Sequence, residues 1–131
     1  MWSAGCLIAM AYLGDRLFPV REDMEHLALI ERSTGRPVPP AMPREAAAEG
    51  HLPKDVAFNA KGRLEWPGPR APDDEEVVRV QQAVPLRERV RPQHRALLEL
   101  LEGMLQVDPK RRLSAETASM LPFVVAEEVP E

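Results

Sequence analysis

The distribution of proline constrains this chain more than any other feature of the sequence. Fourteen of the 131 residues are prolines, and ten of them lie between Pro37 and Pro92. Proline has no backbone N–H to donate and clashes with the preceding turn of a helix, so this stretch cannot form one continuous helix or a central strand. Long regular elements are therefore expected only in residues 1–35 and 93–131, on either side of an irregular middle.

Two helices are predicted before the proline-rich middle. Residues 4–13 are apolar on every side of a helix, as in a helix enclosed by protein, and Gly14 can end it in the left-handed conformation. Asp23 is predicted to cap a second helix that ends at Gly35. The residues predicted for its apolar face are Met24, Leu27, Ala28 and Ile30.

The first apolar stretch could instead be a secretory signal, because its length falls within the usual apolar region of one. It lacks the lysine or arginine that should precede that region, and it is shorter than the ~20 residues of a membrane span. A buried helix is the favoured interpretation, and a small secreted helical protein is kept as an alternative.

Within the middle, only short elements are predicted. Residues 45–49 indicate an alanine-rich turn, and the polar–apolar alternation of residues 62–66 is compatible with a short strand or hairpin arm. Residues 67–76 are proline-rich and then acidic, which is typical of a solvated loop. Residues 77–80 could form a second short element.

The C-terminal segment predicts two more helices. Leu97, Leu100, Leu101 and Met104 follow the i, i+3, i+4, i+7 spacing of an amphipathic helix, which Asp108-Pro109 should stop. Ser114 can cap a last helix, with Glu116 in its first turn, ending near Leu121. The fold class is therefore mainly α, with about four helices.

Composition excludes several kinds of functional site. The net charge of −4 argues against a dedicated nucleic-acid binder, and a single cysteine excludes an internal disulfide and a cysteine-rich zinc site. The seven glycines are too far apart for a phosphate-binding loop. His26, His51 and His94 lack the spacing of a metal site, and residues 73–76 are read as a solvated acidic loop. Cys6 is read as a buried apolar residue, so no catalytic, cofactor-binding or metal-binding residue is predicted.

Several motifs nevertheless resemble one protein family. Residues 1–6, MWSAGC, resemble the D-x-W-S-x-G-C element of the protein-kinase C-lobe, whose aspartate would precede Met1. Residues 25–32, EHLALIER, resemble E-H-L-A-M-M-E-R, the signature of the LAMMER (CDC-like) kinases. Residues 108–114, DPKRRLS, resemble D-P-x-x-R-[IL]-[ST], and residues 121–123, LPF, resemble the closing H-P-F. Residues 61–67, KGRLEWP, are similar to a K-G-R-L-x-W segment in the insert of this family.

The resemblance implies a partial kinase C-lobe over residues 1–124, with residues 36–92 as an insert and 125–131 as an acidic tail. It implies a structural role for these motif positions: Trp2, Ser3, Gly5, Cys6, Glu25, His26, Leu27, Ala28, Glu31, Arg32, Asp108, Pro109 and Arg112. In the family, the arginine matched by Arg112 pairs with the glutamate of A-P-E. That motif is not in this chain, so an unpaired, buried guanidinium is expected.

The implied function belongs to a larger protein. A LAMMER-like parent would be a nuclear or cytoplasmic dual-specificity kinase that uses ATP and Mg²⁺ to phosphorylate Ser, Thr and Tyr in proteins such as Ser/Arg-rich splicing factors. The motifs that bind ATP and Mg²⁺ precede the D-x-W element in kinases and are expected before Met1. The chain is expected to be a fragment, from a truncated gene model or a split gene, and inactive alone. The expected partners are protein substrates, docking proteins or the preceding part of the kinase, and neither nucleic acid nor membrane. A non-catalytic interaction module is the alternative.

Overall fold

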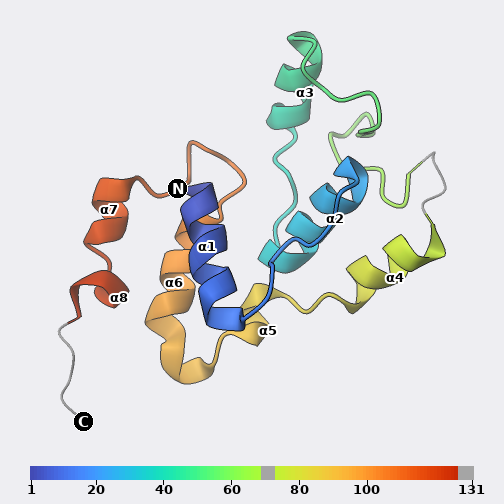
Figure 1. The fold of residues 1–131 in the computed structure, drawn as a ribbon. Coiled ribbons are helices and arrows are strands. Elements are labelled where there is room, and N and C mark those ends of the chain that lie inside the picture. The colour runs from blue at the N-terminus through green and yellow to red at the C-terminus, as the bar shows by residue number, and fades with distance from the viewer. Residues whose placement is uncertain (69–72, 127–131) are drawn as a thin grey trace. The chain divides into compact units, whose positions relative to one another are not determined.

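A computed structural model describes residues 1–68 and 73–126. This part of the chain is helical, with eight α-helices, one 3₁₀ helix and no strand beyond an isolated bridge. It divides into two compact units, one formed by residues 1–17 with the chain from 87 onward, the other by residues 18–86. The predicted mainly α class is confirmed, with additional short helices in the middle and near the end (Figure 1).

The first unit is built around α6 (Arg95–Met104). This helix packs against α1 (Trp2–Leu13), α7 (Ala115–Ser119), α8 (Pro122–Val125) and the 3₁₀ helix η1 (Pro92–His94). All four residues of its predicted apolar face are buried, which confirms the periodicity argument. The predicted cap of α7 is also confirmed, because the Ser114 side chain accepts a hydrogen bond from the Thr117 amide at 3.1 Å.

Helix α1 departs from the prediction of a helix enclosed on every side. Only Gly5 and Ala9 are buried, on the face toward α6, whereas the Leu7 side chain is 61% exposed. An apolar sequence all round a helix permits burial on every side, but the described residues cover one side. The end of α1 is as predicted, since Gly14 has φ 79° and its amide donates to the Met10 carbonyl at 2.8 Å.

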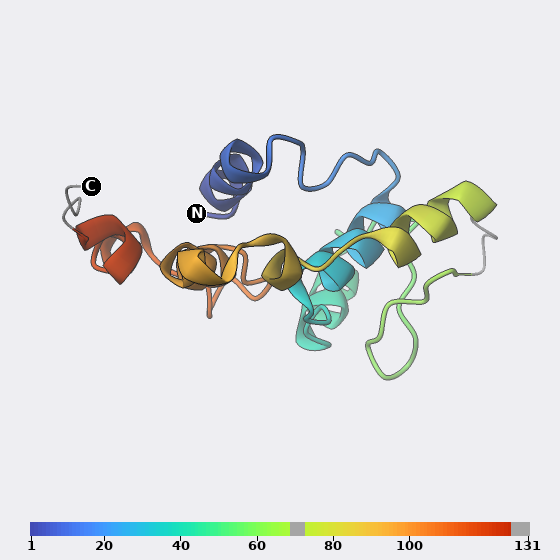
Figure 2. The same cartoon turned by 90° about the horizontal axis from the view of Figure 1, so that it is seen from below.

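The second unit contains α2 (Asp23–Thr34), α3 (Ala41–Ala48) and α4 (Asp74–Gln82), and α5 (Leu86–Arg89) begins at its last residue. Helices α2 and α4 lie side by side in both views (Figures 1 and 2). Gly35 ends α2 as predicted, with φ 70°. The predicted cap is wrong: Glu22 occupies the N-cap position, and Asp23 is the first helical residue, where its charge still favours the helix dipole.

Two predictions for the middle of the chain are wrong. Residues 45–49 were expected to be at most a turn, but most of them belong to α3, which begins at Ala41. This helix can form because Pro43 lies in its first turn, where no intrahelical acceptor is required. The acidic run 73–76, expected to be a loop, begins α4. Its cap is Asp73, whose carboxylate accepts from the Glu75 amide at 3.1 Å, and three carboxylates follow in the positive first turn.

The predicted hairpin arm is present in reduced form. Phe58 and Leu64 form an antiparallel bridge, and the Glu65 amide donates to the Ala57 carbonyl at 2.9 Å. The turn is held by Asn59, whose side-chain oxygen accepts from the amides of Lys61 and Arg63. The loop predicted for residues 67–76 lies outside the described residues at 69–72, as does the acidic tail at 127–131. No helix in the described ranges is long and apolar enough to cross a membrane.

Candidate functional site

Residues 1–68 and 73–126 contain no cluster of metal-binding side chains. No group of three or more His, Cys, Asp or Glu side chains could hold a metal ion there. Cys6 is half-buried, and burial raises the pKa of its thiol above the ordinary value, which favours the unreactive protonated form. The candidate functional positions are therefore the residues of the sequence motifs, which form two groups, one in each unit.

In the first unit, Arg112 and Trp2 come together. The Arg112 guanidinium lies 5.5 Å from the centroid of the Trp2 ring, within the range of a cation–π interaction. It also donates to the Gln106 carbonyl at 2.9 Å and the Val107 carbonyl at 3.2 Å. The expected unpaired, buried guanidinium is therefore wrong. Two carbonyls and an indole ring take the place of a carboxylate, which offsets the cost of removing the charge from water.

Gly5 sets the distance between α1 and α6. A Cβ atom at Gly5 would lie 3.0 Å from Met104 Cβ and 3.1 Å from Leu105 Cδ2, closer than side chains normally pack. The glycine of the D-x-W-S-x-G-C-like motif thus permits a close helix contact. Ser3, on the same helix, is exposed.

The D-P-x-x-R-like motif forms the turn between α6 and α7. The Asp108 side chain accepts from the Lys110 amide at 2.9 Å, and its carbonyl accepts from the Arg111 and Arg112 amides, both at 3.1 Å. Pro109 is exposed on this turn. These bonds direct Arg112 back toward Gln106 and α1.

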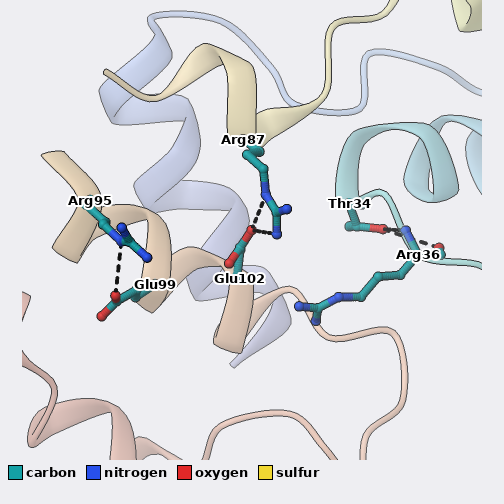
Figure 3. Close-up of polar contacts among 6 residues, drawn as sticks. All are labelled: Thr34, Arg36, Arg87, Arg95, Glu99 and Glu102. Atoms are coloured by element: carbon teal, nitrogen blue, oxygen red, sulfur yellow. Dashed lines mark hydrogen bonds and ion pairs between the residues drawn. The ribbon is translucent and has the colours of Figure 1, made fainter. Parts of the chain in front are cut away.

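Ion pairs on exposed side chains complete the first unit. Two nitrogen atoms of Arg87 donate to one oxygen of Glu102, at 3.1 and 2.8 Å, and Arg95 pairs with Glu99 one turn along α6 (Figure 3). Such exposed pairs each contribute about 0–1 kcal/mol and do not indicate a binding site.

In the second unit, the LAMMER-like octamer occupies most of α2, and three of its charged residues hold segments outside that helix. Glu25 is 2% exposed, and its carboxylate accepts two hydrogen bonds from Arg79 of α4, at 2.7 and 3.2 Å. Hydrogen bonding to Glu25 is the main cause that raises the pKa of Arg79, so that side chain stays charged. A buried carboxylate needs such a partner.

The other two charged residues act on backbone groups. Arg32 donates to the Ala83 carbonyl at 2.9 Å and the Gln81 carbonyl at 3.4 Å, both at the C-terminal end of α4, where a cation favours the helix dipole. Glu31 accepts from the Val38 amide at 2.8 Å, which fixes the chain leaving α2. We call Glu25, Glu31 and Arg32 the α2 clasp.

The remaining motif positions of α2 have packing roles. Ala28 is buried, and Leu27 is half-buried. The His26 ring lies 5.5 Å from the Phe18 ring, at an angle of 49°. After the octamer, Thr34 closes the helix by donating to the Ile30 carbonyl at 2.8 Å and accepting from the Arg36 amide at 3.4 Å (Figure 3).

Glu25 and Arg32 of the α2 clasp hold α4 in place, and the sequence alone did not reveal these contacts. Arg79 and Glu25 are 54 positions apart, and nothing in the local pattern pairs them. One sign was available: Glu25 precedes Ala28 and Leu29 by three and four residues, the spacing that places residues on one face of a helix. A carboxylate buried on that face needs a partner.

Comparisons with known proteins identify the family to which these motifs belong. Arabidopsis thaliana serine/threonine-protein kinase AFC2 is 32% identical over 128 residues, and human dual specificity protein kinase CLK2 is 33% identical over 131 residues. Each match covers 94% of this chain, but only 28% and 23% of the respective kinase. The chain matches the C-lobe portion of LAMMER kinases. No family model matches it.

The three-dimensional match agrees with the sequence match. A crystal structure of a kinase domain superposes with a TM-score of 0.78 and 31% identity over 94% of this chain and 34% of the other. The chain therefore spans about a quarter to a third of the kinases it resembles. The α2 clasp and the Trp2–Arg112 contact are part of a kinase-like fold.

Loss of the Arg79 side chain should weaken the second unit. We expect Arg79→Met to lower the urea midpoint followed by Trp66 fluorescence, because Glu25 would stay buried without its cation. Arg44→Met on the exposed face of α3 is the control, expected to change stability by less than about 0.5 kcal/mol. Equal midpoints for the two variants would contradict a stabilising role for the clasp.

Proposed function

We propose that this chain serves as the lower part of the C-lobe in a LAMMER-type protein kinase. The observation that supports this proposal most directly is that 94% of the chain matches a kinase-domain structure with a TM-score of 0.78. The whole kinase would transfer phosphate from ATP to Ser, Thr and Tyr of proteins. Ser/Arg-rich splicing factors in the nucleus or cytoplasm are the proposed substrates.

The residues of this chain do not fit an ATP–Mg²⁺ site. The sequence contains no G-x-G-x-x-G loop, no H-R-D-x-x-x-x-N and no D-F-G, the motifs that hold the phosphates and Mg²⁺ in kinases. His94-Arg95-Ala96 is not a catalytic loop, because alanine stands where H-R-D has aspartate and the three residues follow the D-x-W-like motif instead of preceding it. The proposed contribution of this chain is structural: α1, α6 and the α2 clasp would support the catalytic part.

A phosphotransfer assay tests this proposal. We expect the purified 131-residue chain to transfer no phosphate from labelled ATP and Mg²⁺ to an Arg/Ser-rich peptide, because it lacks the groups that bind both. Human CLK2, assayed in parallel, serves as the positive control. Activity that stays with the chain through repurification would overturn the proposed division of roles. Circular dichroism on the same sample must show the helices, so that inactivity is not attributed to unfolding.

A further inference from the structure

The thioether of Met24, in the second unit, can be oxidised, a reaction that has no role in the fold or in the kinase resemblance. Met24, the second residue of α2, contacts Ala57 at the start of the hairpin loop 57–68 and lies near Gly68 at its end. Its thioether sulfur accepts a hydrogen bond from the Ala57 amide at 3.4 Å. Its methyl group faces Gly68, where a Cβ atom would lie 3.4 Å from Met24 Cε. We propose that Met24 is an oxidation site whose conversion to the sulfoxide releases this loop from α2.

The position suits oxidation by a small peroxide. Met24 is half-buried, so its sulfur is neither sealed in the core, as at Met104 (3% exposed), nor simply on the surface, as at Met120 (62% exposed). In the reaction, sulfur loses two electrons to hydrogen peroxide. The O–O bond breaks, one oxygen bonds to sulfur, and the other leaves as water. Methionine sulfoxide reductases reverse the step, which makes it a switch and not only damage.

Oxidation would act on both contacts of Met24. Oxidation withdraws electron density from the sulfur, so its remaining lone pair is a weaker acceptor for the Ala57 amide, and an oxygen added on the side that faces Ala57 would not fit within the 3.4 Å contact. Oxidation also turns a flexible apolar side chain into a larger, polar one, which no longer packs well against the Gly68 backbone.

Two trypsin cleavage sites in the loop can show whether it has been released. Lys61 and Arg63 are exposed in the turn, and both amides are held by Asn59 in the closed hairpin. Trypsin cleaves after these residues only when the backbone opens locally. Lys110 and Arg111, in the first unit, provide internal reference sites that Met24 does not contact.

The experiment treats the full chain with hydrogen peroxide, maps sulfoxides by mass spectrometry, and follows limited trypsin cleavage. We expect Met24 to oxidise more slowly than Met120 and faster than Met104. Once Met24 is oxidised, cleavage after Lys61 and Arg63 should rise about three- to tenfold, as expected for losing one hydrogen bond, while cleavage after Lys110 should not change. Treatment with both methionine sulfoxide reductases should restore the original rate.

Two variants make the test specific. Met24→Leu keeps the volume but has no sulfur, so its loop should be cleaved somewhat faster at the outset and peroxide should have no further effect. Met120→Leu is the matched control and should respond to peroxide as the unaltered chain does. An unoxidised Met24 at a dose that fully converts Met120 would overturn the proposal. So would Met24 sulfoxide without faster cleavage, or the same peroxide response in Met24→Leu.

Discussion

Replacing Leu101 by alanine should destabilise the first unit by about 2–5 kcal/mol. Leu101 is 0% exposed and belongs to α6, the helix against which α1, α7 and α8 pack. Its removal leaves a cavity that close-packed neighbours can fill only in part. Because a domain's net stability is typically about 5–15 kcal/mol, this one change should remove much of the stability of the unit.

Urea unfolding followed by Trp2 fluorescence in a Trp66→Phe background measures this effect, since Trp2 belongs to the first unit and Trp66 to the second. Leu7→Ala is the matched control, because Leu7 on α1 is 61% exposed and loses little burial on truncation. Its expected change is below about 0.5 kcal/mol. If Leu7→Ala cost as much as Leu101→Ala, the assignment of α6 as the core of this unit would be wrong.

Replacing Gly62 by alanine should destabilise the second unit by about 2–5 kcal/mol, for two physical reasons. Gly62 has φ 77°, which an L side chain adopts only with strain. A Cβ atom there would also lie 2.6 Å from Pro40 Cβ and 2.9 Å from Pro40 Cα. The backbone of the proline-rich segment cannot rotate away as a flexible side chain would, so the turn itself must move.

Gly50→Ala separates these two causes. Gly50 has a similar φ of 72°, but a Cβ atom there would meet nothing within 4 Å. It should therefore cost only the backbone strain, about 1–2 kcal/mol. The difference between the two variants, read from Trp66 fluorescence during urea unfolding, measures the contact with Pro40. Identical losses would show that this contact contributes nothing.

The sequence alone determined the parts of this protein that depend on neighbouring residues. The 3.6-residue periodicity placed the buried face of α6, and the glycines that end α1 and α2 followed from the need for a left-handed residue at those positions. Ser114 was recognised as a cap for the same local reason. The motif order also sufficed to identify the kinase resemblance, which the comparisons confirmed.

Local pattern misjudged α3 and α4, where two tendencies compete. Proline argues against helix in general but not in the first turn, and a run of carboxylates resembles a solvated loop until one of them caps a helix. Which tendency prevails depends on what the helix packs against. For α4 that partner is α2, to which Arg79 is bound through Glu25.

Only the tertiary structure decided which groups satisfy the buried and half-buried charges. The sequence predicted that Arg112 would be unpaired, because the carboxylate expected for it is not in the chain. In the structure, its guanidinium donates hydrogen bonds to the Gln106 and Val107 carbonyls and lies over the Trp2 ring. The sequence likewise could not pair Glu25 with Arg79, 54 residues away. The physical reason is that a charge removed from water requires a partner but does not specify which one. Chain topology brings the partner into place.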